Sequence, residues 1–110
     1  MFSVDDNLTI TISRGDTATI AVKVEAEDGE TVDGTMLMSL KKIISSEKTI
    51  WQKSVDISEG TVEYSISADD TNDLVFGTYY WDLRVVFGDG TVYTPISPKK
   101  FVVAEVIGDV

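Results

Sequence analysis

Hydrophobic and polar side chains alternate with a period of two along residues 77–87. One face of this run is apolar, and the other is mostly polar or charged. The apolar positions are Tyr79, Trp81, Leu83, Val85 and Phe87. Successive side chains of a β-strand point to opposite sides of the sheet, so the pattern predicts a strand with one buried face. Gly88-Asp89-Gly90 and a second β-prone run, 91–96, follow, and an Asp-Gly pair between two such runs predicts a β-hairpin.

The same alternation recurs on both sides of this hairpin, in shorter runs separated by residues that favour turns. The further runs that we expect to be strands are 8–13, 17–26, 49–57, 61–67 and 99–106. In the fourth of these the inward positions are Val62, Tyr64 and Ile66, whereas the pattern of 49–57 leaves its inward face open. Proline lacks a backbone N–H, so we expect the chain to break at Pro98 and 99–106 to be a separate strand.

Residues 36–44 fit two interpretations. Met36, Met38 and Leu40 alternate as in a strand, but Met36 and Leu40 also fall on one helical face with the isoleucines that follow them. Periodicity alone does not separate a strand from a helix over so short a run. We favour a strand, because the neighbouring segments are β-patterned and the run has no good N-cap residue.

Three segments between these runs are expected to be turns or loops. Arg14-Gly15-Asp16 interrupts the alternation, and its glycine suits a backbone conformation that a Cβ atom would disfavour. Residues 27–34 are rich in acidic residues and glycine, which predicts a loop. Residues 68–74 contain Asp and Asn, which favour caps and turns, and predict one short helical turn inside a loop.

Tyr79 lies two residues before Trp81 and directly after that loop. This placement is typical of the tyrosine corner of immunoglobulin-like domains, in which the phenol OH bonds the preceding loop. Trp81 is then expected to fill the core. About 7–8 short strands with frequent turns predict an all-β fold, an immunoglobulin-like antiparallel β-sandwich, and the length of 110 residues predicts that 1–110 is a single domain.

The composition narrows the possible functions. Nineteen acidic against nine basic side chains give a net charge of −10, which disfavours nucleic acids and anionic membrane surfaces as partners. The acids are dispersed along the chain, as is usual for solubility, and a cationic protein or a metal cation stays open as a partner. The sequence has no Cys and no His, so disulfides, thiolate metal sites and the usual neutral-pH acid–base residue are all excluded.

The same absence argues against catalysis. A nucleophile–base pair needs His or Cys in most hydrolytic sites, and a carboxylate pair needs a defined separation across a cleft that a small sandwich seldom has. We therefore expect no enzyme activity and no cofactor. The N-terminus has neither a basic segment nor an apolar core of the signal-peptide type, and no apolar run is long enough to span a membrane. We expect the chain to be made in the cytosol and either to stay there or to leave by lysis.

Two carboxylate clusters are weak candidates for calcium, a cation that takes several oxygen ligands. One consists of Asp69, Asp70 and Asp73, and the other lies in the acidic loop, residues 27–33. Neither has the ligand spacing of a known calcium motif, and short helical turns are commonly rich in Asp without any metal. The ordinary interpretation, a polar turn, is favoured.

Exposed aromatic residues could bind a sugar by stacking. The period of two places Tyr79 and Trp81 in the core and leaves Tyr80, Tyr93 and Trp51 as candidates for exposed positions. Core packing explains most aromatic residues of a small β domain. A carbohydrate-binding surface is the minority interpretation, because aromatic residues on a sheet face do occur at binding sites.

The Arg14-Gly15-Asp16 tripeptide also matches the integrin-binding motif. The tripeptide is common by chance, and here it falls where a strand must turn. A turn is the favoured interpretation.

Four segments of the chain together resemble a known family. They are Arg-Gly-Asp-Thr-Ala-Thr-Ile (14–20), Gly-Thr-Tyr-Tyr-Trp-Asp-Leu (77–83), Gly-Asp-Gly-Thr-Val (88–92) and Lys-Phe-Val-Val (100–103). In this order they resemble the immunoglobulin-like N-terminal domain of phage baseplate upper proteins, and related tail-associated proteins of phages that infect Gram-positive bacteria.

The resemblance implies a non-catalytic structural protein of a phage or prophage particle, assembled in the host cytoplasm. Such a module docks onto other tail or baseplate proteins and forms a homo-oligomer, but its shared motifs are fold residues, so no binding residues carry over. Sheet edges are natural docking sites, and we expect 8–13 and 99–106 to be edge strands or strands that augment a partner's sheet. The alternative is a carbohydrate- or cell-surface-binding module, which would need an export signal.

Overall fold

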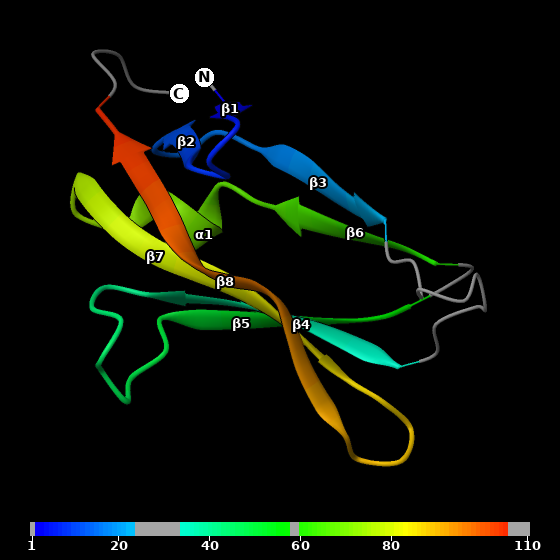
Figure 1. Cartoon of the computed structure of the whole chain (residues 1–110). Coiled ribbons are helices and arrows are strands. Elements are labelled where there is room, and N and C mark those ends of the chain that lie inside the picture. Colours follow the sequence, from blue (N-terminus) through cyan, green and yellow to red (C-terminus); the bar gives the residue numbers. More distant parts are fainter. Residues whose placement is uncertain (1, 24–33, 58–59, 106–110) are drawn as a thin grey trace.

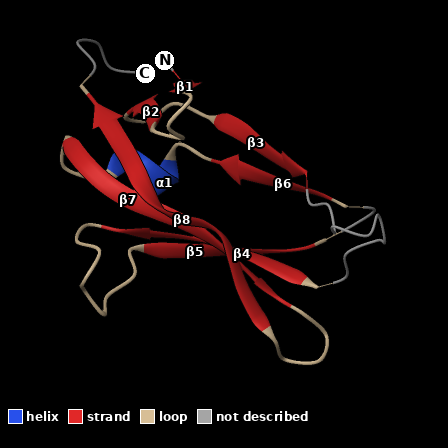
Figure 2. Cartoon of the chain, viewed as in Figure 1, coloured by secondary structure: helices blue, strands red, loops and turns tan. Residues whose placement is uncertain are grey.

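The computed structural model of the protein describes residues 2–23, 34–57 and 60–105. In these residues strands follow one another with a single short helix between them (Figures 1 and 2). The elements are β1 (Phe2–Val4), β2 (Ile10–Ser13), β3 (Ala18–Lys23), β4 (Thr35–Lys41), β5 (Trp51–Asp56), β6 (Thr61–Ile66), α1 (Asp69–Asn72), β7 (Gly77–Val86) and β8 (Val92–Ala104). The prediction of a β-rich chain with about 7–8 strands is confirmed.

The strands form two sheets of unequal size. The larger is a curled sheet of six strands in the order β1-β2-β8-β7-β4-β5, and the smaller contains only β3 and β6. The large sheet is mixed, because β2 runs parallel to β8 while its other pairs are antiparallel. The expectation of a purely antiparallel sandwich is therefore wrong in this respect. The two strands of the small sheet cover part of one face of the six-stranded sheet, as Figure 1 shows.

The core lies between the two sheets. Its fully buried side chains come from alternate positions of β2, β4, β6, β7 and β8, which are Ile10, Ile12, Met36, Met38, Leu40, Val62, Tyr64, Ile66, Leu83, Val85, Phe101 and Val103. The inward face predicted for β7 is confirmed, with Tyr79 at 4% and Trp81 at 3% exposure. The phenol of Tyr64 also ties the sheets together, since it donates to the Met36 backbone oxygen at 2.7 Å.

The ambiguous segment 36–44 is a strand over most of its length. β4 ends at Lys41, and its buried side chains are every second residue, as the strand interpretation requires. Ile43 and Ile44, which suggested a helical face, lie in the turn that follows and are 59% and 51% exposed. β5 is antiparallel to β4 and turns Trp51 and Val55 toward the core, which settles the face that its pattern left open.

The predicted break at Pro98 is wrong, because β8 runs through it as one strand from Val92 to Ala104. Trp81 faces Lys99, Leu83 faces Ile96 and Val85 faces Tyr93, so twice along the pair β8 takes three residues where β7 takes two. The extra residue of a bulge has no ladder partner, so it needs no N–H donor. Pro98 and Pro95 each fall inside one of these irregularities, which is how the strand accommodates both prolines.

The prediction of edge strands is also wrong. The segments 8–13 and 99–106 were expected at the sheet edges, but β2 lies between β1 and β8, and β8 lies between β2 and β7. Within the described residues the large sheet ends at β1 and β5. β1 was missed because three residues are too few to show a period.

The turns behave as their sequences indicate. Arg14-Gly15-Asp16 joins β2 to β3, with Gly15 at a φ of +87° that favours glycine. The backbone N–H of Asp16 donates to Ser13 O at 3.0 Å. The β7–β8 hairpin turns at Gly88-Asp89-Gly90 as predicted. There the Thr91 N–H donates to Asp89 Oδ1 at 2.8 Å, and this bond lowers the pKa of Asp89.

The short helix α1 lies in the loop before β7, as predicted, and this loop is bonded to Tyr79. The Tyr79 phenol donates to the Val75 backbone oxygen, four residues earlier, at 2.7 Å. This is the hydrogen bond expected of a tyrosine corner. The indole N–H of Trp81 donates to Leu8 O at 3.1 Å, so the core tryptophan is also tied to the β1–β2 turn.

Candidate functional site

A polar pocket lies on the outer face of the large sheet, where β8 is irregular. Asp82 and Arg84 have no directly opposed residue on β8, because each lies beside one of its register shifts. The gap that this leaves has a volume of about 160 Å³. Its lining comes from β4, β5, β7, β8 and the β4–β5 turn, and comprises Ser39, Lys41, Ile44, Thr49, Gln52, Tyr80, Trp81, Asp82, Arg84 and Pro98.

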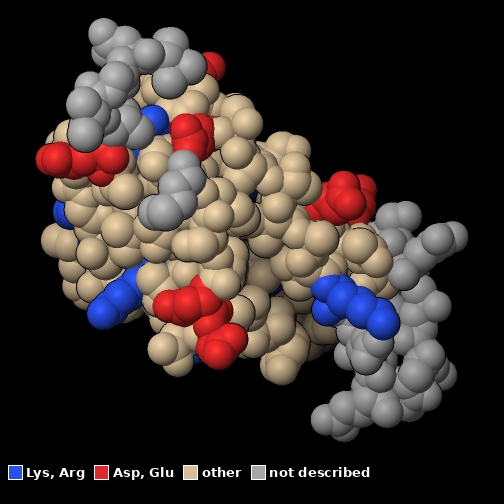
Figure 3. Space-filling model, turned by 90° about the horizontal axis from the view of Figure 1, so that it is seen from above, with Lys and Arg blue, Asp and Glu red and all other residues tan. Residues whose placement is uncertain are grey.

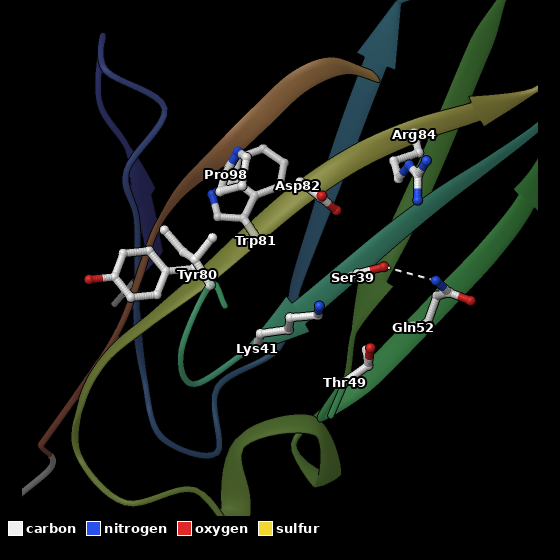
Figure 4. Close-up of a pocket in the computed structure, with 10 residues that line it drawn as sticks. Ser39, Lys41, Thr49, Gln52, Tyr80, Trp81, Asp82, Arg84 and Pro98 are labelled. Atoms are coloured by element: carbon white, nitrogen blue, oxygen red, sulfur yellow. Dashed lines mark hydrogen bonds between the residues drawn. The ribbon is translucent and has the colours of Figure 1, made fainter. Parts of the chain in front are cut away.

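Charges of both signs meet in this pocket. Figure 4 shows Asp82 and Arg84 following one another along β7, with Lys41 on the neighbouring β4. Asp82 Oδ1 is buried and has no hydrogen-bond donor among the described residues. Burial raises the pKa of Asp82, and the positive charges of Arg84 and Lys41 oppose that shift. Lys41 Nζ donates to Ser46 O at 2.8 Å, and Gln52 Nε2 donates to Ser39 Oγ at 2.9 Å.

The side chains that line this pocket are mainly polar or charged. It offers hydrogen-bond donors and acceptors close together, as hydroxylated ligands require. It contains one carboxylate, so the two-carboxylate geometry of glycoside hydrolysis is missing from the pocket.

The structure separates the two aromatic residues expected to be exposed. Tyr80 lines the polar pocket at its far end from Arg84 (Figure 4), whereas Tyr93 is 60% exposed near the hairpin. Tyr80 and Val85 are five residues apart on β7, so their side chains point to opposite faces of the sheet. Tyr93 pairs with Val85 and shares its face, so Tyr93 and Tyr80 also lie on opposite faces. The two tyrosines therefore cannot form one stacking platform.

Trp51, the third aromatic candidate, belongs to the core and not to an exposed face. Its ring meets that of Phe101 edge-on, with the ring centres 6.1 Å apart. Its indole N–H donates to Asp70 O at 3.2 Å. Trp51 was only a candidate for an exposed position, since the pattern of 49–57 left its inward face open. β5 turns this residue inward, where it is partly buried against the core.

The acidic residues of the helical turn do not converge on a metal site. Asp70 Oδ2 accepts from the Ser67 N–H at 2.8 Å and pairs with Lys53 Nζ at 2.9 Å, so this carboxylate already has partners. No group of three or more acidic, His or Cys side chains in the described part of the chain could hold a metal ion. The calcium hypothesis for Asp69, Asp70 and Asp73 gains no support from the geometry. The second candidate, 27–33, lies outside the described residues.

The Arg14-Gly15-Asp16 turn is held by the loop that contains α1. The guanidinium carbon of Arg14 lies 4.5 Å from the ring centre of Phe76, and the Gly15 N–H donates to Thr71 Oγ1 at 2.9 Å. Thr71 is fully buried, and the bond that it accepts from Gly15 is partly buried. These contacts explain Arg14 and Gly15 as residues that hold the turn in place, which favours the interpretation of the motif as a turn.

An apolar groove lies between the small sheet and the β1–β2 end of the large one. β3 forms one wall, the β1–β2 region forms the other, and Trp81 and Ile96 contribute from β7 and β8. The groove has a volume of about 420 Å³. Its side chains are Phe2, Val4, Leu8, Ile10, Thr19, Ile20, Ala21, Val22, Lys23, Trp81 and Ile96.

Among the residues that the structure describes, charged side chains of both signs lie on the side of the molecule that carries β1 and β3. Figure 3 views the molecule from the side where β1 and β3 lie in Figure 1, and it shows acidic and basic groups scattered over a largely uncharged surface. Val4, at 43% exposure, contributes apolar surface there. The groove is thus an apolar recess with an exposed apolar residue at its β1 wall, in a surface of mixed charge.

Sequence reasoning found Tyr80 but missed both recesses. The polar pocket depends on the register shifts between β7 and β8, and these are visible only in the three-dimensional pairing of the two strands. The groove exists because none of the described strands pairs with the free edge of β3. The alternation within 17–26 predicted an inward face but contained no information about what covers it.

Within the described residues, no helix is long and apolar enough to cross a membrane. Comparison of the chain with models of protein families and with curated proteins finds no match.

Proposed function

We propose that the protein is a non-catalytic structural component of a phage or prophage tail or baseplate, and that it mediates assembly by docking onto other proteins of the particle. The observation that carries this proposal is the apolar groove beside β3, since an apolar recess of this size at a sheet edge is a feature of protein-binding surfaces. The choice of a phage tail as the particle rests on the resemblance to tail-associated domains, which is carried by residues 14–20, 77–83, 88–92 and 100–103.

The proposal includes an immunoglobulin-like fold. Three features support it. The Tyr79 phenol bonds Val75 O in the way of a tyrosine corner, and Trp81 is buried two residues later on the same strand. β2, β8, β7 and β4 are neighbours in that order, with β3 and β6 forming the opposite sheet. An immunoglobulin-like domain with a reduced second sheet is the arrangement we propose.

A homo-oligomer is part of the same proposal. The outer edge of β5 ends the large sheet at the side away from the groove, so it offers a second surface for contacts between copies. The proposed location is the virion, after assembly in the host cytoplasm. No nucleic acid or membrane partner is proposed, because the net charge of −10 disfavours both.

The test is the composition of the particle. The phage or prophage that encodes the chain is induced, the particles are purified by density gradient, and tails are analysed by mass spectrometry and antibody labelling. The proposal predicts the chain in tail or baseplate fractions at a fixed ratio to the other tail proteins. Intact particles that lack the chain would contradict it.

The second candidate function is carbohydrate binding, which the polar pocket favours. Tyr80 offers a ring at one end, and Gln52, Asp82 and Arg84 offer donors and acceptors for hydroxyl groups. A nuclear magnetic resonance titration with glucose and glucuronate tests it. Shifts confined to the pocket and lost in Tyr80→Ala would support this function, and no shift with either sugar would remove it.

A further inference from the structure

The groove beside β3 has the shape and the backbone edge needed to receive one more strand. β3 is paired on one side only, with β6, and no strand of the described chain lies on its other side. An unpaired edge presents backbone N–H and C=O groups that can bond an added strand. The small sheet can therefore be extended at β3 without disturbing an existing pair.

The groove follows this edge along its length. Five consecutive residues of β3, Thr19 to Lys23, line it. At about 3.3 Å per residue, this stretch matches an extended segment of about five residues. Trp81 and Ile10, both core residues, line the same groove, so its floor reaches the core.

Apolar side chains at alternate positions of an added strand would fill this recess. The side chains of Ile20 and Val22 on β3 are only half-buried, as are Phe2 and Leu8 on the facing wall. A strand that bonds the β3 edge turns every second side chain toward this apolar surface. A helix could cover the same surface, but it would leave the β3 edge unpaired.

The net charge of the protein favours a basic partner, although one cation, Lys23, is among the residues that line the groove. Each copy carries a net charge of −10, so a second copy entering the groove would meet long-range repulsion. Asp5 and Asp6, both exposed, follow Val4 directly at the β1 wall. A segment that carries lysine or arginine between its apolar residues is attracted by the same field.

We propose that the groove is a strand acceptor, in which an extended segment of another protein, with alternating apolar and basic residues, pairs with β3 and places its apolar side chains against Ile20, Val22 and Trp81. This inference rests on the proposed docking function and specifies its mode. It does not depend on the particle in which the docking takes place.

The test uses the full chain and a designed seven-residue peptide that alternates lysine and isoleucine. Two matched peptides serve as controls. One has glutamate in place of lysine, and the other is N-methylated at alternate residues on the edge meant to face β3. Binding is followed by nuclear magnetic resonance, with amide hydrogen exchange measured along β3. The lysine peptide is expected to bind and to slow exchange at β3 at least about tenfold, which corresponds to 1.4 kcal/mol.

The control peptides and variants locate the site and its chemistry. The N-methylated peptide is expected to lose binding, and the glutamate peptide is expected to bind more weakly at low salt. Val4→Lys adds a cation at the groove wall and should weaken binding of the lysine peptide about tenfold or more, whereas Val75→Lys, at a 74% exposed site away from the groove, should leave it unchanged.

Three outcomes would overturn the proposal. They are a lack of binding by the folded protein, binding that Val4→Lys leaves unchanged, and a homodimer that Val4→Lys dissociates and that excludes the peptide. The last would make a second copy the occupant. If the chain is found in particles but the peptide fails, only the strand acceptor is lost; if the peptide binds but particles lack the chain, only the particle role is lost.

Discussion

β3 and β6 are paired strands with the same alternating pattern, yet their inward side chains end in different surroundings. Val62, Tyr64 and Ile66 of β6 are 1% exposed. Their partners on β3, among them Val22 opposite Val62 and Ile20 opposite Tyr64, are only half-buried. Pattern decides which way a side chain points, and the neighbour beyond the strand decides how far it is buried. β6 packs toward β5, whereas β3 borders the open groove.

The largest expected effect comes from Trp81, which belongs both to the groove beside β3 and to the closed core beneath β6. Trp81 lies on the floor of the groove and packs into the closed core. Trp81→Ala removes the indole and its bond to Leu8 O, at an expected cost of about 3–5 kcal/mol. We expect the variant to be unfolded or nearly so in thermal and urea denaturation. A cooperative melt within a few degrees of the parent would show that the indole contributes little.

The comparison itself is tested by a matched pair of substitutions at facing positions. Val62→Ala removes two methyl groups from a closed environment and should cost about 2 kcal/mol. Val22→Ala makes the same chemical change beside the groove and should cost about half of that or less. Urea denaturation of both variants measures the two values. Equal costs would mean that the groove is filled in solution.

A smaller effect is expected at the loop before β7, which Tyr79 holds by one hydrogen bond. Tyr79→Phe removes the hydroxyl that donates to Val75 O and leaves the ring in place, at an expected cost of about 1 kcal/mol. Tyr93→Phe removes a hydroxyl from a residue that is 60% exposed and should be neutral within experimental error. Chemical denaturation compares the two. If Tyr79→Phe is as stable as Tyr93→Phe, the tyrosine corner does not stabilise the loop.

The smallest effect concerns the polar pocket and depends on pH. Burial raises the pKa of Asp82 in the folded state, so above that pKa the ionised carboxylate makes folding less favourable. As pH falls through the raised pKa, the carboxylate takes up a proton and this cost disappears. Asp82→Asn should therefore equal or exceed the parent in stability at neutral pH, by less than about 1 kcal/mol because the group is partly solvated, and the difference should shrink in acid.

Urea midpoints of both proteins over a series of pH values measure this difference. A variant that is less stable than the parent at neutral pH would mean that attraction to Arg84 and Lys41 outweighs the cost of burial.

The sequence predicts the strands well where alternation is long, as in β7, β6 and β4, because a period of two fixes their inward side chains. It predicts the hairpin and the Gly15 turn because those residues have strong local preferences. It misplaces the break at Pro98, since a bulge that accommodates proline depends on the register of β7. The described residues contain eight strands, the upper number expected. The numbers agree only because the unexpected β1 offsets the joining of two expected strands, 91–96 and 99–106, into β8.

The candidate sites were less predictable, because they arise from relations between strands that lie far apart in the chain. Tyr80 was found by its exposed position in an alternating run. Its neighbours Gln52 and Lys41 reach the same pocket only through the pairing of β4 with β5 and β7. The groove exists because β3 has a strand on one side only in the described structure, and the alternation within β3 cannot predict this.

Residue-resolved amide hydrogen exchange of the free full chain tests the open edge of β3 most directly. The account predicts that alternate amides between Ala18 and Val22, those not bonded to β6, exchange at nearly unprotected rates, while the amides of β4 and β7 exchange only through global unfolding. Uniformly strong protection of all β3 amides, equal to that of β7, would contradict the open edge and the docking role built on it.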